Sequence, residues 1–148
     1  MPLINRSALV SFSAEQMFTL VNDVERYPEF LPGCSGSKLI ESSQTAMVAS
    51  VDVSKAGIKK TFTTSNLMIP DRLIKLQLVD GPFKSLSGSW HFIPLDDFAC
   101  KIEFQLEFEF SNKLIEMAFG KIFNELTSNM VKSFTQRAKQ IYVNPKYS

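Results

Sequence analysis

The sequence contains few of the side chains that most enzymes use for proton transfer, nucleophilic attack or metal binding. It has one histidine, His91, and two cysteines, Cys34 and Cys100, which form no CxxC pair. One imidazole and two separated thiols cannot make a metal site by themselves, because such sites need three or four protein ligands. We therefore predict no metal site, and we expect both cysteines to be buried, reduced thiols of a cytoplasmic protein.

Glycine, long apolar runs and net charge are also scarce, and each absence excludes a class of function. The six glycines form neither GxGxxG nor GxxxxGK[ST], so no loop that binds nucleotide phosphates is expected. No run approaches the roughly 20 apolar residues that span a bilayer, and the start, MPLINRSALV, does not resemble a signal peptide. A formal net charge of +1 gives no strong field that would attract DNA.

Phenylalanine is abundant, with 13 copies against 3 tyrosines and 1 tryptophan. Phenylalanine buries a large apolar area without needing a hydrogen-bond partner. A chain of 148 residues is long enough to form one domain with a sizeable core. We therefore predict a single domain, residues 1–148, with a large, apolar and dry interior.

The N-terminal part predicts a strand followed by a helix. Residues 3–11 have the composition of a short strand. Ser13 and Gln16 have the spacing of a capping box, which predicts a helix that begins at Ala14.

The stretch VERYPEFLPGC, residues 24–34, fits neither helical nor strand periodicity. Pro28 disfavours helical backbone at Tyr27, so the preceding helix should end before that residue. With a second proline at Pro32, the stretch should make only a short helical turn, beginning at Pro28.

Between residues 34 and 110 the apolar residues recur with a period of two, which indicates an antiparallel meander. The predicted strands cover residues 36–43, 45–54, 57–69, 72–79, 84–93 and 98–110. In the last of these, from Lys101 to Phe110, apolar residues alternate strictly with charged or amide side chains. One face of the sheet should therefore be buried and the other exposed to water.

Residues 112–142 predict one long helix, with Asn112 as its cap and an apolar stripe at three- and four-residue steps. Gly120 interrupts this stripe and is a candidate for close packing or a slight bend. A 30-residue helix is about 45 Å long, and a 13-residue strand is about 43 Å long. We therefore predict an α+β fold in which a curved antiparallel sheet wraps around a long C-terminal helix.

This order of elements is similar to the helix-grip fold of the START-like superfamily, also called SRPBCC, which encloses an apolar cavity between sheet and helix. The string VERYPEFLPGC resembles the coenzyme Q-binding branch of that superfamily, often described as polyketide cyclase/dehydrase-like. The resemblance covers about residues 1–143. It is specific to the branch and not to one activity within it.

The resemblance implies two functions. The leading one is non-enzymatic binding of ubiquinone or a similar prenyl lipid in support of cellular respiration, with transient contact with the inner-membrane surface. The alternative is that of the ribosome association toxins of toxin-antitoxin systems, which bind the large ribosomal subunit and block its joining with the small one. Neither requires a cofactor. A weaker alternative is a polyketide cyclase or aromatase, which would need an inward polar pair that the sequence does not supply.

Apolar side chains on the predicted inward faces are the candidate ligand-binding residues. Tyr27, Phe30 and Leu31 should form a lid or rim wall at one end of the cavity, or else an ordinary apolar plug. The strands and the helix contribute Ile74, Leu76, Leu78, Leu86, Trp90, Phe92, Phe104, Leu106, Phe108, Phe119, Phe123, Leu126 and Met130. A buried five-carbon prenyl unit would contribute on the order of 3–4 kcal/mol before ordering costs. The alternative for each residue is that it only packs in the core.

Positive charge is concentrated at the C-terminal end. Residues 112–148 carry six Lys and Arg and two Glu, a net charge of +4, so the rest of the chain carries −3. The candidate partner-binding residues are Lys113, Lys121, Lys132, Arg137 and Lys139, and the sixth cation is Lys146. They would contact ribosomal RNA or anionic lipid headgroups. The alternative is a solvated helix face.

No catalytic residue is predicted. His91 has the opposite strand parity to Trp90 and Phe92, so its imidazole should lie on the wet face of the sheet. Glu103 and Glu107 belong to the charged face of the last strand and should form a solvated stripe rather than an acid–base pair.

Overall fold

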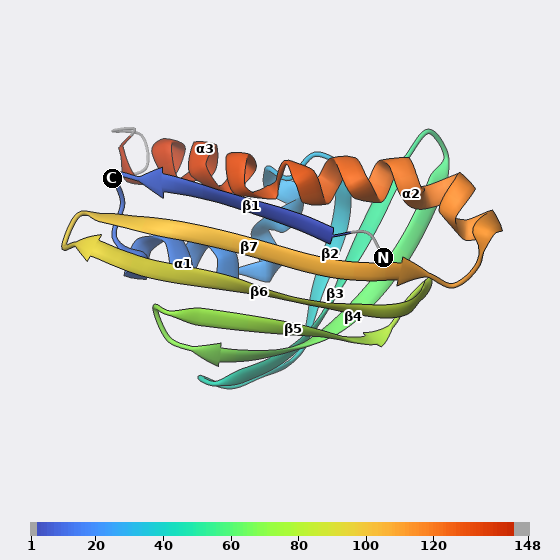
Figure 1. Ribbon diagram of the computed structural model, residues 1–148, viewed down its shortest axis with the longest axis horizontal. Helices are drawn as coiled ribbons and strands as arrows, with labels where there is room; N and C mark the ends of the chain where they lie inside the picture. The colour runs from blue at the N-terminus through green and yellow to red at the C-terminus, as the bar shows by residue number, and fades with distance from the viewer. Residues whose placement is uncertain (1–2, 144–148) are drawn as a thin grey trace.

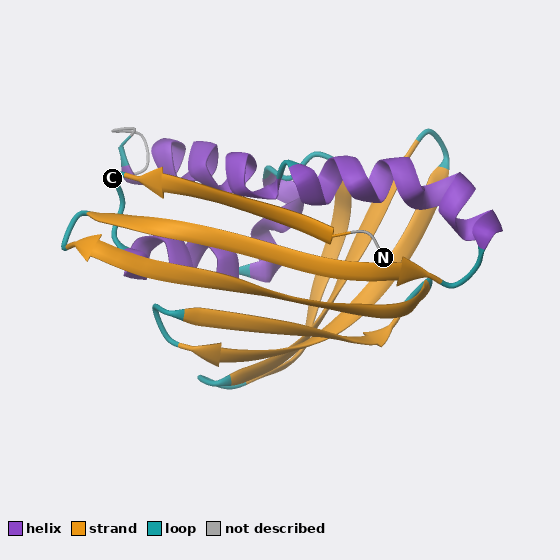
Figure 2. Cartoon of the chain, viewed as in Figure 1, coloured by secondary structure: helices purple, strands orange, loops and turns teal. Residues whose placement is uncertain are grey.

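The computed structural model describes residues 3–143 and contains one curved sheet with helices on one side of it (Figures 1 and 2). Lys146 lies outside the described residues. The elements are β1 (Leu3–Val10), α1 (Ala14–Asn22), the 3₁₀ helix η1 (Val24–Glu29), β2 (Cys34–Ser42), β3 (Ala46–Lys55), β4 (Ile58–Ile69), β5 (Leu73–Asp80), β6 (Phe83–Asp96), β7 (Ala99–Phe110), α2 (Lys113–Ser128) and α3 (Met130–Tyr142). The predicted α+β class is confirmed.

The sheet has seven strands in the order β1-β7-β6-β5-β4-β3-β2, and all pairs are antiparallel. The six strands from β2 to β7 form the predicted meander, because short turns join strands of matching apolar periodicity. β1 completes the sheet by pairing with β7, with Leu3 opposite Glu107 and Val10 opposite Cys100. The first strand is therefore placed by a partner that lies far along the chain.

The capping box at the start of α1 is confirmed. The amide N–H of Gln16 donates to Ser13 Oγ at 3.0 Å, and the amide N–H of Ser13 donates to Gln16 Oε1 at 2.9 Å. The predicted helical turn from Pro28 is wrong, because η1 begins at Val24 and contains Pro28. Its closing bonds, such as Arg26 N–H to Asp23 O at 3.2 Å, do not require an N–H from proline.

The predicted long helix is interrupted at Asn129, which separates α2 from α3. The Asn129 side-chain amide donates to Glu125 O at 2.8 Å, and Thr127 Oγ1 donates to Phe123 O at 2.9 Å. Side chains that bond to helix carbonyls in this way compete with the backbone ladder and bend helices. Gly120 is not at the interruption, and α2 continues through it.

The paired helices α2 and α3 lie across the concave side of the sheet, with α1 beside α3 (Figure 1). Phe123 and Phe134 are fully buried between helix and sheet, as are Cys100 and the inward residues of β7. Both cysteines are buried free thiols, as predicted. At the end of α3, Tyr142 Oη donates to the Gln16 carbonyl at 3.0 Å, which joins the last helix to the first.

Candidate functional site

A small, mostly apolar cavity lies between the sheet and the α2–α3 junction. Its volume is about 70 Å³. Its lining comes from η1 and the following turn, strands β3 to β7 and both C-terminal helices: Val24, Tyr27, Leu31, Ala49, Val51, Phe62, Thr64, Asn66, Leu76, Leu86, Trp90, Phe104, Leu106, Phe123, Leu126, Thr127 and Met130. A water occupies about 30 Å³, whereas ligand pockets are usually about 300–1,000 Å³. In this conformation the cavity does not accommodate a prenyl tail.

The structure brings ten of the sixteen candidate ligand-binding residues to this cavity. These are Tyr27, Leu31, Leu76, Leu86, Trp90, Phe104, Leu106, Phe123, Leu126 and Met130. The remaining six do not line it: Phe30, Ile74, Leu78, Phe92, Phe108 and Phe119. Phe92, Phe108 and Phe119 are at most 1% exposed and fill the core on either side of the cavity. Strand parity identified the inward face but not how far along the face the space remains open.

Three polar residues that line the cavity were not predicted. Thr64 and Asn66 of β4 and Thr127 of α2 are buried, and Thr64 Oγ1 donates to Asn66 Oδ1 at 2.8 Å. Candidate residues were selected for apolar side chains, so polar residues were not considered. In β4 the residues around Thr64 and Asn66 read TFTTSN, which does not indicate a buried strand. The signal that identifies them is the parity of Phe62 and Met68, which places every second residue of β4 inward.

The lining residues offer no group that transfers a proton near neutral pH. None of the cavity residues is Asp, Glu, His, Lys, Arg or Cys. Burial raises the pKa of the Tyr27 phenol far above its usual value, and its hydroxyl donates to the Val21 carbonyl. The hydroxyl therefore stays protonated and serves to hold η1 against α1.

The segment VERYPEFLPGC is fastened to α3. The Phe30 ring packs against Phe134 with a centroid distance of 5.2 Å, and Tyr27 packs against the same ring at 5.3 Å. Arg137 Nη2 lies 2.6 Å from Glu29 Oε1, and its guanidinium lies over the Phe30 ring. Phe30 therefore belongs to a contact outside the cavity, whereas Tyr27 and Leu31 form part of the cavity wall.

Arg137 is not a free surface cation, contrary to the sequence-based expectation, because its side chain is only 12% exposed and paired with Glu29. The other candidate partner-binding residues are exposed: Lys113, Lys121, Lys132 and Lys139. Lys113 opens α2 and Lys139 lies in the last turn of α3, so these lysines are spread along the whole length of the paired helices.

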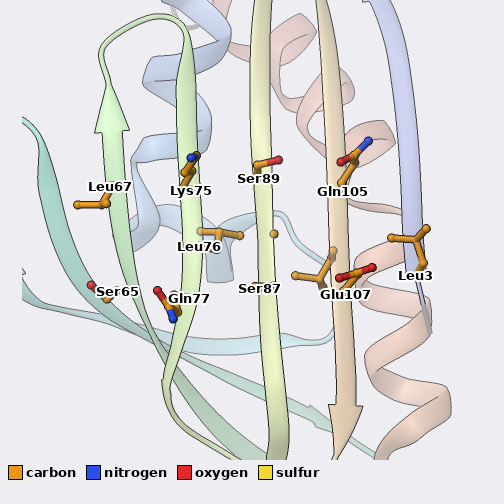
Figure 3. Close-up of a pocket in the computed structure, with 12 residues that line it drawn as sticks. Leu3, Ser65, Leu67, Lys75, Leu76, Gln77, Ser87, Ser89, Gln105 and Glu107 are labelled. Carbon is orange, nitrogen blue, oxygen red and sulfur yellow. The ribbon is translucent and has the colours of Figure 1, made fainter. Parts of the chain in front are cut away.

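The opposite face of the sheet carries a broad, open hollow of about 710 Å³ (Figure 3). Its centre is polar, with serines of β6 and glutamines of β5 and β7, and Lys75 and Glu107 lie on either side. Gly88 is required here, because a Cβ would lie 2.4 Å from Gln105 O. His91 is exposed, as predicted from its parity.

Residues 3–143 contain neither a metal-binding cluster nor a membrane-spanning helix. Within that range no three His, Cys, Asp or Glu side chains gather in a way that would hold a metal ion. No helix in the same range has the length and apolarity needed to cross a bilayer.

A family profile described as polyketide cyclase/dehydrase and lipid transport matches residues 10–135. The chain is 72% identical over 142 residues to the ribosome association toxin RatA of Vibrio cholerae, covering 96% of this chain and 99% of that protein. It is 61% identical over 142 residues to RatA of Escherichia coli K12, covering 96% and 90%. It is 29% identical over 143 residues to the mitochondrial coenzyme Q-binding protein COQ10 homolog B of Xenopus laevis, covering 93% and 58%.

Solved structures share the fold. The Zhui aromatase/cyclase of Streptomyces sp. R1128 superposes with a TM-score of 0.83 at 16% identity, covering 97% of this chain and 96% of that one. The 18 kDa protein CC1736 of Caulobacter crescentus superposes with a TM-score of 0.72 at 26% identity, covering 96% and 99%. The aromatase/cyclase likeness supports the helix-grip architecture alone, since its sequence identity is low.

Proposed function

The chain belongs to the polyketide cyclase/dehydrase and lipid transport family, as its resemblance predicted, and we propose that within this family it acts as a toxin on ribosome association. The observation that carries the proposal is near-full-length similarity to proteins named ribosome association toxin, at 72% and 61% identity. In this proposal the protein binds the large ribosomal subunit in the cytoplasm and blocks its joining with the small one. The alternative implied by the sequence thus takes precedence over lipid binding.

The small volume of the interior cavity favours a function carried by the outer surface. The cavity of about 70 Å³ is well below the size of a ligand pocket. Its lining contains no side chain that would act as an acid or base near neutral pH. Blocking subunit association requires neither, because a bound protein only has to cover surface that the other subunit needs. The proposed activity is therefore non-enzymatic.

Sucrose-gradient profiles test the proposal. Purified large and small subunits are mixed at a magnesium concentration that joins them, with increasing amounts of the protein. We expect the joined-ribosome peak to fall, both subunit peaks to rise, and the protein to sediment with the large subunit. An equal amount of the heat-unfolded protein is the control. An unchanged joined peak, with the protein remaining at the top of the gradient, contradicts the proposal.

A second candidate function is binding of a hydrophobic ligand such as ubiquinone. The observation that favours it is the Thr64–Asn66 pair, which gives a mostly apolar cavity a hydrogen-bonding group suited to a carbonyl headgroup. The likeness to COQ10 homolog B supports the same candidate more distantly. A prenyl ligand would require the cavity to open well beyond its volume of about 70 Å³.

Native mass spectrometry of the protein purified from cells, followed by organic extraction, tests this second candidate. A stoichiometric lipid adduct that disappears on extraction supports it. Protein that carries no adduct, and takes up none when incubated with ubiquinone, contradicts it. The ribosome experiment is independent, since one function uses the interior and the other the exterior.

A further inference from the structure

A groove separates the α2–α3 junction from the turn that follows η1. Its volume is about 500 Å³. One wall consists of Pro32 and Gly33 with the end of β3, at Ser54 and Lys55. The other wall comes from the two helices: Ile122, Glu125, Leu126, Asn129, Lys132, Ser133 and Gln136. Because β3 lies near the edge of the sheet opposite β1, the groove lies on the β3 side of the helices, away from β1.

The charge of this groove is positive. Lys55 Nζ on one wall lies 2.9 Å from Glu125 Oε2 on the other, and both side chains are exposed. Lys121 lies four residues before Glu125 on α2, so the two side chains are neighbours on one face of that helix. The hydrogen bond from Lys55 lowers the pKa of Glu125, and the charge of Lys121 lowers it further. Lys132 lines the groove and forms no ion pair within residues 3–143. Lys55 and Lys132 in the lining, with Lys121 beside it, thus outnumber the single carboxylate of the groove.

Neutral hydrogen-bonding groups accompany these lysines. Ser54 and Ser133 contribute hydroxyls from opposite walls, and Gln136 contributes a side-chain amide. Phosphate oxygens in nucleic acids are contacted by this combination of Lys with Ser and Gln. The helix wall contributes only two large apolar side chains, Ile122 and Leu126, among polar ones, so the groove suits a charged strand better than an apolar one.

We propose that this groove binds the phosphodiester backbone of RNA, with Lys55, Lys121 and Lys132 as the phosphate-contacting residues. The inference rests on the proposed function, because the RNA would be that of the large ribosomal subunit. The Lys55–Glu125 pair is exposed and therefore weak. A phosphate takes the place of the Glu125 carboxylate at Lys55, and Glu125 is the group that limits affinity.

The proposal selects among the lysines predicted from the sequence and adds one. Lys132 lines the groove, and Lys121 lies one helical turn before the lining residue Glu125, whereas Lys113 and Lys139 belong to the far ends of α2 and α3. Lys55 was not predicted, since it lies on the β3–β4 hairpin and reaches the helices only in the folded protein.

Binding of isolated large subunits to Lys132→Glu and Lys55→Gln variants tests the groove, with Lys75→Glu as the control. Lys75 is exposed on the outer face of the sheet, outside the groove. Lys75→Glu therefore changes the net charge by the same amount as Lys132→Glu without altering the groove. We expect Lys132→Glu to weaken binding about tenfold and to reduce the slope of log K against log salt by about 1. The control should bind like the wild type. Circular dichroism verifies that each variant folds.

Glu125→Gln supplies a test in the opposite direction. Removing the carboxylate frees Lys55 and should strengthen binding several-fold, which no loss of folding would imitate. If the wild type binds large subunits while Lys132→Glu and Glu125→Gln bind equally well, the groove proposal is overturned and the proposed function stands. If the wild type does not bind, the proposed function fails.

Anionic lipid is the competing partner for the same lysines. Vesicles of phosphatidylglycerol with phosphatidylcholine are therefore tested with the same variants. If the lysine substitutions reduce vesicle binding and leave ribosome binding unchanged, the RNA assignment is overturned. If they reduce ribosome binding alone, it is supported.

Discussion

Arg137 of α3 donates to Glu29 of η1 at 2.6 Å, although 108 residues separate them in the chain. The guanidinium carbon lies 5.1 Å from the centre of the Phe30 ring. The Arg137 side chain is therefore packed between a carboxylate and an aromatic face. These contacts favour a fixed wall over a lid for the segment VERYPEFLPGC.

Arg137→Ala should lower the free energy of unfolding by about 1–3 kcal/mol, because a largely buried cation loses its ion pair and its packing on Phe30. Arg26→Ala is the control, since Arg26 pairs with the same Glu29 but its side chain is 62% exposed. Its loss should stay below about 1 kcal/mol. Urea unfolding measures both, and equal losses would mean that the buried pair contributes nothing special.

Phe30→Ala should lower stability by about 2 kcal/mol or more, because its ring packs against Phe134 and Tyr27 outside the cavity. Leu31 lies in the cavity wall, so Leu31→Ala should enlarge the cavity itself. Thermal unfolding and lipid uptake are measured on both variants. A loss of lipid uptake by Phe30→Ala with an unchanged melting temperature would restore the lid interpretation.

The Thr64–Asn66 pair predicts non-additive substitutions. Thr64→Val leaves Asn66 Oδ1 without its donor inside an apolar cavity, at a cost of about 1–3 kcal/mol. The double variant Thr64→Val with Asn66→Leu removes both hydrogen-bonding side chains, so neither is left unpaired. Its loss of unfolding free energy should be smaller than the sum of the losses in the two single variants. Denaturant unfolding of the four proteins in the cycle measures the coupling. Simple additivity contradicts the proposed pairing.

Cys34 predicts a loss of stability at alkaline pH. Burial raises the pKa of its thiol from 9.0 to about 11. Between these values the unfolded chain binds fewer protons than the folded one, so stability is intact below pH 9 and falls as the pH rises toward 11. Cys34→Ala should show a shallower fall over this interval. Identical curves of unfolding free energy against pH would contradict the assignment.

Local patterns in the sequence predicted most of the fold. The alternation in β7 gave its buried face, and the Ser13–Gln16 spacing gave the start of α1, because both depend on neighbouring residues. The interruption at Asn129 was not predicted, because the apolar pattern there is strongly helical. The interruption arises from side-chain hydrogen bonds to backbone carbonyls of α2, such as that from Asn129 to Glu125 O, which compete with the backbone hydrogen bonds of the helix.

Features that depend on distant residues could not be predicted in the same way. The partner of Arg137 lies in η1, and that of Lys55 lies in α2, so one lysine was overlooked and one arginine was assigned to the surface. The small volume of the cavity depends on how side chains from five strands and two helices fill the space between them. The periodicity of the sequence does not specify this packing.

The bond between Tyr142 and Gln16 has a consequence for the order of events during synthesis. Residues 126 apart must meet before α3 is seated, and β1 must likewise wait for β7. Because a chain emerges from its N-terminus, β1 cannot pair until β7 has been synthesised, and the helix wall of the groove cannot form until α3 has been synthesised. A protein whose proposed target is the ribosome would thus lack its proposed binding surface while its N-terminal strands are being made.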